Sequence, residues 1–224
     1  MTPAQVAITA FLVVAPASLG AVHAGDLVPQ RASSEEMATL RAAAEAGDAA
    51  AQHKFGMRLV ESSARESDPE EGVRWLKRAA AQSYLPAMYD LAVAYYQGTG
   101  ADRDYAEAAR WFEAAAHRGH GPAAFNLGAM YDDGLGVARD RDKAVVLLTQ
   151  AAREGVPEAM HTIGSLLAEE SRTDEDLIEA LKWLLLAEAL DDGDIEQDLL
   201  ALYGRLPQSS RQEGGRRARE WLRR

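Results

Sequence analysis

Residues 84–119, YLPAMYDLAVAYYQGTGADRDYAEAARWFEAAAHRG, and residues 120–155, HGPAAFNLGAMYDDGLGVARDRDKAVVLLTQAAREG, are two copies of one pattern. They align without a gap at a spacing of 36 residues, and the same step extends back to residue 48 and forward to residue 191. Four units therefore cover residues 48–191, which is typical of a repeat protein. Two columns that repeat without change are Ala51, Ala87, Ala123, Ala159 and Asp68, Asp104, Asp140, Asp176.

Each unit is predicted to form two helices, here called helix A and helix B. In the second unit, Met88, Leu91 and Tyr95 share one face of a helix A that starts near Pro86 and stops before Gly98. Helix B starts at the recurring aspartate, whose carboxylate can cap free backbone N–H groups of the first turn. A glutamate three positions later predicts a capping box in three units, at Glu71, Glu107 and Glu179.

A column of small residues predicts that the two helices of a unit approach closely. A single helix pair cannot bury its apolar face alone, so the units must stack on one another. The predicted fold is an all-α solenoid of about four to five helix-turn-helix repeats with a capping helix at each end. The small residues of the column are Gly56, Ala92, Gly128 and Gly164.

The two ends of the repeat region differ from the four units. Residues 25–47 are predicted to be a linker and an N-capping helix, which starts at Ser33-Ser34-Glu35-Glu36 and ends before Gly47. Residues 192–224 are predicted to be a divergent fifth unit, since Trp221 lies 38 rather than 36 residues beyond Trp183. Its last 20 residues carry seven arginines and two glutamates, and this basic tail either caps the final unit or acts as an electrostatic arm.

Residues 1–24 resemble a secretory signal peptide. The run VAITAFLVVA from Val6 to Ala15 is uncharged and too short to span a bilayer as an ordinary helix, and small residues precede a cleavage point after Ala24. No Lys or Arg precedes the apolar run, so a buried N-terminal helix is the alternative. We expect a periplasmic or secreted protein with no integral membrane span after cleavage.

Composition excludes several function classes. The 224 residues carry a formal net charge of −11, which disfavours nucleic acid as a partner. The chain has no cysteine, which excludes disulfides, thiolate zinc sites, cysteine nucleophiles and thiol-linked lipid anchors.

The repeat resembles the Sel-one-like repeat (SLR) family, a branch of the tetratricopeptide-like superfamily. The likeness rests on AAFNLGAMYDDGLGVARD from Ala123 to Asp140 and on LAVAYYQGTG from Leu91 to Gly100. The first and fourth units depart from it, with Ser62, Ala64, Glu170 and Arg172 where the family has loop glycines. The resemblance implies a right-handed α-α solenoid that acts as an adaptor or scaffold and holds another protein on its concave side. A cysteine-rich branch associated with β-lactam hydrolysis is excluded by the absent cysteines.

If helix A lines the concave side, one column becomes a candidate partner-binding ladder. Its rings could stack against an extended peptide or a sugar chain. The alternative is that they only fill space between repeats. Asn126, beside the ladder, suits the backbone-bonding role that the superfamily gives to a helix A asparagine. The ladder consists of His53, Tyr89, Phe125 and His161.

No motif indicates catalysis, a cofactor or a metal. The chain lacks G-x-S-x-G, S-x-x-K and H-E-x-x-H sequences. His117 and His120 have no third ligand nearby, and Asp132-Asp133-Gly134 does not complete a calcium loop. We therefore expect no catalytic, cofactor or metal site, and a non-enzymatic interaction protein with a protein partner. The runner-up is a periplasmic regulator or export component that binds polysaccharide or peptidoglycan, and an envelope hydrolase ranks last.

Overall fold

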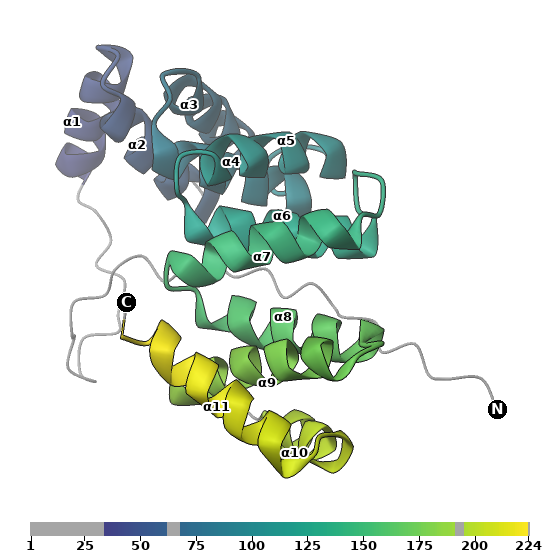
Figure 1. Cartoon of the computed structure of the whole chain (residues 1–224). Helices are drawn as coiled ribbons and strands as arrows, with labels where there is room; N and C mark the ends of the chain where they lie inside the picture. Colours follow the sequence, from purple (N-terminus) through teal and green to yellow (C-terminus); the bar gives the residue numbers. More distant parts are fainter. Residues whose placement is uncertain (1–33, 62–67, 191–194, 224) are drawn as a thin grey trace. The chain divides into compact units, whose positions relative to one another are not determined.

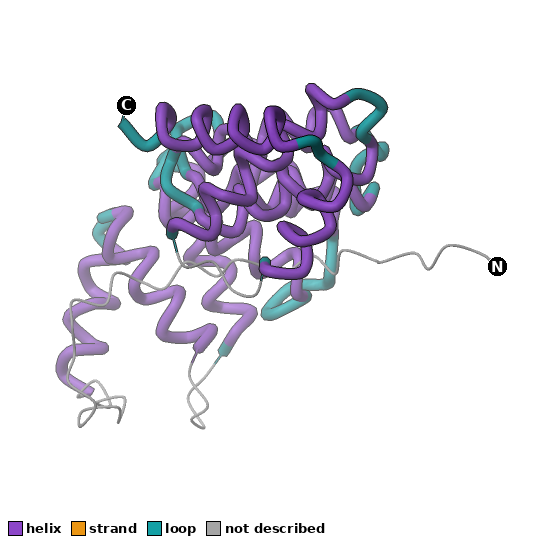
Figure 2. Tube along the Cα trace, turned by 60° about the horizontal axis from the view of Figure 1, so that its bottom comes forward, coloured by secondary structure: helices purple, strands orange, loops and turns teal. Residues whose placement is uncertain are grey.

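The computed structural model describes residues 34–61, 68–190 and 195–223, and over these ranges it contains eleven α-helices and no strand (Figures 1 and 2). The expected signal segment, residues 1–24, lies outside them. An all-α repeat fold is thus confirmed. The capping helix α1 spans Ser34–Glu45. The four units then give the pairs α2 Ala49–Glu61 and α3 Pro69–Ala81, α4 Leu85–Gln97 and α5 Tyr105–Ala116, α6 Gly121–Asp133 and α7 Arg141–Arg153, and α8 Pro157–Glu170 and α9 Asp174–Ala189. The fifth pair is α10 Glu196–Arg205 and α11 Gln208–Trp221.

The chain divides into two compact units, unit 1 from Met1 to Arg139 and unit 2 from Asp140 to Arg224. Unit 1 holds α1 to α6, and unit 2 holds α7 to α11. The division falls inside the third repeat, between its helix A and its helix B. Each unit has its own apolar core, with Leu76, Leu91 and Phe112 fully buried in unit 1 and Leu148, Leu181 and Leu184 in unit 2.

Close helix approach in the first repeat confirms the role expected for the small-residue column. A Cβ on Gly56 of α2 would lie 2.8 Å from the carbonyl oxygen of Gly72 on α3, and one on Gly72 would lie 2.7 Å from that of Gly56. Beside this contact, Phe55 and Trp75 meet edge to face at 5.6 Å. The two backbones can touch only because both positions lack a side chain.

The recurring aspartate caps helix B in three repeats. Asp68, Asp104 and Asp140 accept hydrogen bonds from backbone N–H groups of the first turn of α3, α5 and α7. In the fourth repeat, the expectation that Asp176 starts helix B is wrong. There the N-cap is Thr173, and Asp176 completes a reciprocal capping box with it. Helix α9 therefore starts three residues earlier than an N-cap at Asp176 would allow.

The glutamates that follow the cap are not the reciprocal partners that the spacing predicts. The carboxylate of Glu71 accepts a hydrogen bond from the indole N–H of Trp75 at 3.2 Å, and that of Glu107 pairs with Arg110. One aspartate carboxylate accepts hydrogen bonds from one or two free backbone N–H groups at each helix start. The glutamates are therefore available to pair with side chains three or four residues further along the helix.

Loop shape between helices A and B follows the glycines. Gly98 and Gly100 in the second repeat have φ of 76° and 70°, and Gly134 and Gly136 in the third have 72° and 69°. The fourth repeat has no glycine there, and the C-cap residue Ser171, which follows α8, has φ of −54°. A different loop in this repeat was expected and is confirmed, whereas the first-repeat loop, residues 62–67, lies outside the described residues.

The basic tail forms α11 and packs on α9 in unit 2. A Cβ on Gly214 would lie 2.9 Å from the side chain of Leu181, and Trp221 meets the edge of Trp183 at 5.9 Å. Arg217 reaches back to Glu175 at 2.6 Å. The helix begins at Gln208. These contacts favour the capping interpretation of the tail.

Deleting residues 211–224 is expected to unfold unit 2 or to lower its melting temperature sharply. The deletion removes the contacts that bury Leu181 and Trp183, which are 0% and 4% exposed. Circular dichroism melting of the full chain and the deletion variant measures this. The double variant Arg219→Ala, Arg223→Ala removes charge and keeps the helix, so it should melt like the parent. An unchanged melt of the deletion variant would support the electrostatic arm instead.

Candidate functional site

Side chains of adjacent helices A pair with one another at a sequence separation of 37 residues. In unit 1, Nε2 of His53 lies 2.6 Å from Oδ2 of Asp90, and the amide of Asn126 donates to the hydroxyl of Tyr89 at 3.4 Å. In unit 2, Nε2 of His161 lies 2.8 Å from Oδ2 of Asp198. A separation of one repeat plus one residue means that His53, Tyr89 and His161 each reach the next column of the following helix A. Three of the four ladder residues therefore make hydrogen bonds between repeats within their unit, and Phe125 has no side-chain group that can do so.

A second column of rings, which the sequence reasoning missed, lies beside the ladder. Tyr84, just before α4, has its ring 5.4 Å from that of His53, and His120, just before α6, has its ring 4.6 Å from that of Tyr89. Both partners lie 31 residues after the ladder residue. The signal was present in the sequence, because Tyr84 and His120 are themselves 36 residues apart.

His120 holds the start of α6 as well as stacking on Tyr89. Its Nδ1 accepts a hydrogen bond from the backbone N–H of Ala123 at 3.2 Å, so this nitrogen carries no proton in that arrangement. Burial lowers the pKa of His120, an effect that the nearby carboxylate of Asp90 partly opposes. The hydrogen bond and the ring contact fix the orientation of the imidazole, and burial disfavours its charged form.

The five predicted partner-binding residues differ in exposure. Tyr89 and Phe125 are each 5% exposed and Asn126 is 4% exposed, so burial favours the space-filling alternative for these three. The side chains of His53 and His161 keep 17% and 34% of their surface exposed. The ladder is thus not a continuous row of open ring faces, because its middle members pack inside unit 1.

Three ring residues and one carboxylate of unit 1 are partly exposed and held by neighbouring side chains or backbone, and we call them the helix-A face. It consists of His53, Tyr84, Asp90 and His120. Each member has a partner that fixes its orientation or stacks on it: His53 with Asp90 and Tyr84, and His120 with Ala123 and Tyr89. The face offers hydrogen-bond donors, acceptors and partly exposed aromatic surface at the helices A of the first three repeats.

Two side chains near the C-terminal ends of α4 and α6, the hydroxyl of Tyr96 and the carboxyl of Asp133, have raised pKa values. Burial raises the pKa of Tyr96, whose ring meets that of Tyr105 at 5.3 Å. Burial also raises the pKa of Asp133, and neighbouring Asp132 adds to the shift while Arg139 opposes it. These groups form no metal site: within the described residues no three His, Asp or Glu side chains come close enough together to hold an ion.

Lowering the pH is expected to destabilise the protein through His120. Burial holds the pKa of His120 in the folded state below its ordinary value of 6.5, so the unfolded chain binds more protons than the folded one as the pH drops through that region, and stability falls. The variant His120→Asn keeps an N-capping side chain that does not titrate. Urea unfolding at pH 7.5 and pH 5.5 should show a smaller loss for the variant, and equal losses would contradict the role given to His120.

Comparison with known proteins identifies the family. The model of the Sel1 repeat matches residues 49–84, 85–120, 121–156 and 157–192. The chain belongs to the Sel1 repeat family. Each match begins one residue after the unit expected from the 36-residue spacing. Sel1 repeats generally mediate protein–protein interactions and are generally non-enzymatic, which supports a protein partner.

Solved Sel1 structures share the fold. A protective antigen present in uropathogenic Escherichia coli strains, which displays an SLR fold, is 30% identical, with a TM-score of 0.69 over 82% of this chain and 40% of its own. This chain thus spans less than half of that antigen. A Sel1 repeat protein from Oxalobacter formigenes is 22% identical, with a TM-score of 0.70 over 82% of this chain and 79% of its own. None of the curated proteins compared with the chain matches it.

No helix in the described part of the chain is long and apolar enough to cross a membrane.

Proposed function

We propose that this protein is an exported, non-enzymatic Sel1 repeat adaptor that binds an extended segment of another protein across the helix-A face of unit 1. The observation that supports this best is the fixed presentation of His53, Tyr84, Asp90 and His120. Their rings and acid groups are already held by partners of this chain, so little side-chain entropy is lost when a partner binds. The family architecture predicts that this face is concave.

A peptide backbone suits the chemistry of this face. The carboxylate of Asp90 can accept hydrogen bonds from backbone N–H groups, and the hydroxyl of Tyr84 can accept or donate one. Tyrosine and histidine rings give contact area with few rotatable bonds, which is the property of binding hot spots. A sugar chain would need open ring faces, and Tyr89 and Phe125 are buried.

Export is the second part of the proposal. It rests on the uncharged segment from Val6 to Ala15 and on the small residues before Ala24. The mass of the chain purified from its native cells tests it. A mature chain that starts at Gly25 is the expected result, and an intact Met1 in a cytoplasmic fraction would contradict export without affecting the helix-A face.

Quantitative co-purification from native cells tests the adaptor role. Tyr84→Ala shortens a partly exposed side chain of the helix-A face and should lose most of any specific partner while melting nearly as the parent does. Arg74→Ala, at an arginine of α3 with 60% of its side chain exposed, is the control and should keep the partner. Equal recovery of the partner with Tyr84→Ala would contradict the proposal. A glycan pull-down with the same variants separates the polysaccharide alternative.

A further inference from the structure

Unit 2 carries an open groove on its helix-B side, away from the ladder columns. The groove has a volume of about 760 Å³ and is formed by α7, α9 and α11, with one contribution from α8. Its apolar lining includes Val145, Leu167, Trp183, Trp221 and Leu222. The two indoles are in edge contact, and Leu222 is 51% exposed. Two indoles and three aliphatic side chains give a surface that fits a bulky apolar side chain.

The groove is a departure from the repeat pattern. Val145 belongs to the column Val73, Ala109, Val145 and Leu181, whose other members are 2%, 4% and 0% exposed. Val145 is only partly buried and lines the groove instead. The next residue, Val146, is 68% exposed, the most exposed large apolar residue among those described. Helix B of the third repeat therefore leaves uncovered, beside α9, a position that the other repeats bury.

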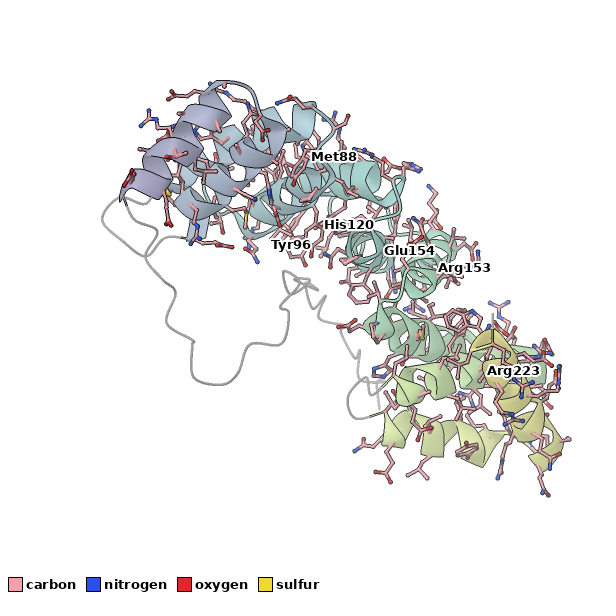
Figure 3. The ribbon with its side chains drawn as sticks, turned by 90° about the vertical axis from the view of Figure 1, so that its left-hand side faces the viewer. Met88, Tyr96, His120, Arg153, Glu154 and Arg223 are labelled. Atoms are coloured by element: carbon pink, nitrogen blue, oxygen red, sulfur yellow. The ribbon has the colours of Figure 1, made fainter. Side chains whose placement is uncertain are left out.

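Positive charge without an internal partner lies in the lining of the groove and directly after it in the sequence. Glu179 in the groove is already paired with Lys182 and with Arg217. Arg153, at the end of α7, lines the groove, and Arg223 directly follows the lining residue Leu222. Neither arginine side chain has a hydrogen bond or an ion pair within the described residues. Figure 3 labels both, one on α7 and one after the end of α11.

We propose that this groove is a second docking site, which binds a short peptide segment of a partner protein with a bulky apolar side chain between acidic residues. The apolar side chain occupies the space between Val145, Trp183 and Trp221. Its flanking carboxylates pair with Arg153 and Arg223, which the groove leaves uncompensated. The site is separate from the helix-A face, so the adaptor has one surface in each unit and can engage two segments.

A fluorescein-labelled peptide Asp-Glu-Phe-Leu-Asp-Glu is the probe, with Lys-Lys-Phe-Leu-Lys-Lys and Asp-Glu-Ala-Ala-Asp-Glu as matched controls. Fluorescence anisotropy should show saturable binding of the acidic apolar peptide alone. In proton–nitrogen correlation spectra, the indole signals of Trp183 and Trp221 should shift, while those of Trp75 and Trp111 should not. Each indole signal is assigned by a single Trp→Phe variant.

Two variants test the groove itself. Arg153→Glu should weaken binding by roughly tenfold, since an attraction becomes a repulsion, whereas Arg219→Glu, an exposed arginine of α11 outside the lining, should change it little. Thr149→Phe fills the groove and should abolish binding. Melting curves show that each variant is folded.

Three results would overturn the proposal. The first is no saturable binding of the acidic peptide below about 1 mM, a Kd that corresponds to the weakest specific contacts. The second is equal binding of the lysine-flanked peptide. The third is a concentration-dependent dimer that Thr149→Phe removes, which would assign the groove to a second copy of this chain. These three results concern the groove alone. The helix-A face is tested separately by Tyr84→Ala, so failure of one proposal can be told from failure of the other.

Discussion

Replacing Tyr89 by alanine should lower the free energy of unfolding by about 3–5 kcal/mol, whereas Tyr89→Phe should cost only about 1 kcal/mol. The ring is 5% exposed and packs against Phe112 and His120, with centroid distances of 5.8 and 4.6 Å. Truncation leaves a cavity in unit 1, while loss of the hydroxyl removes one long hydrogen bond to Asn126. Urea unfolding of the three proteins measures both effects.

Tyr84→Ala is the matched control because it removes a tyrosine at the N-cap of α4, the helix that contains Tyr89. Tyr84 is only half-buried, so its replacement should cost about 1 kcal/mol or less in stability. The two variants thus test two roles separately: packing for Tyr89 and partner contact for Tyr84. A Tyr89→Ala protein of nearly unchanged stability would mean that Tyr89 is an exposed contact residue after all.

Gly100→Ala is the second substitution with a large expected effect, a loss of about 3 kcal/mol or more. Gly100 has φ of 70°, and a Cβ there would lie 2.1 Å from the carbonyl oxygen of Pro69 and 2.5 Å from its carbonyl carbon. Pro69 is the first residue of α3 in the preceding repeat. The clash is with backbone atoms and cannot be relieved by a side-chain rotation. The loop that contains Gly100 would therefore have to move away from α3 of the preceding repeat.

Gly155→Ala isolates the conformational part of that cost. Gly155 has φ of 83°, but nothing lies within 4 Å of a Cβ built there. Its substitution should cost about 1–2 kcal/mol, the price of a left-handed backbone conformation for an L-residue. Thermal or urea unfolding compares the two variants. Similar losses for both would show that the loop does not rest on Pro69 as the structure has it.

Much of the fold could be predicted because it repeats. A column such as Asp68, Asp104 and Asp140 is visible only when the same capping requirement occurs at a constant spacing, and the structure confirms these caps. The prediction was wrong at Asp176 because Thr173 offers a competing N-cap three residues earlier, which only the fourth unit has. A residue that only one repeat has, such as Thr173, cannot be found by comparing the repeats position by position.

The candidate site was only partly predictable. The ladder rings were found as a column, but whether a ring is open or buried depends on its neighbours in adjacent helices, at separations of 23, 31 and 37 residues. His53 lies against Tyr84 and Asp90 and keeps exposed surface, while Tyr89 lies between Phe112 and His120 and loses it. The repeat spacing identifies which residues occupy equivalent positions. How exposed each of them is depends on how the adjacent helices pack.

Site-specific photo-crosslinking in native cells tests the central claim most directly. A benzophenone amino acid replaces Tyr84 on the helix-A face, or Arg74 on α3 as the exposed helix-B control. We expect one partner protein to be crosslinked at position 84, through one short segment of its chain, and not at position 74. Crosslinking of that partner at position 74 alone, or its co-purification with no crosslink at position 84, would contradict it.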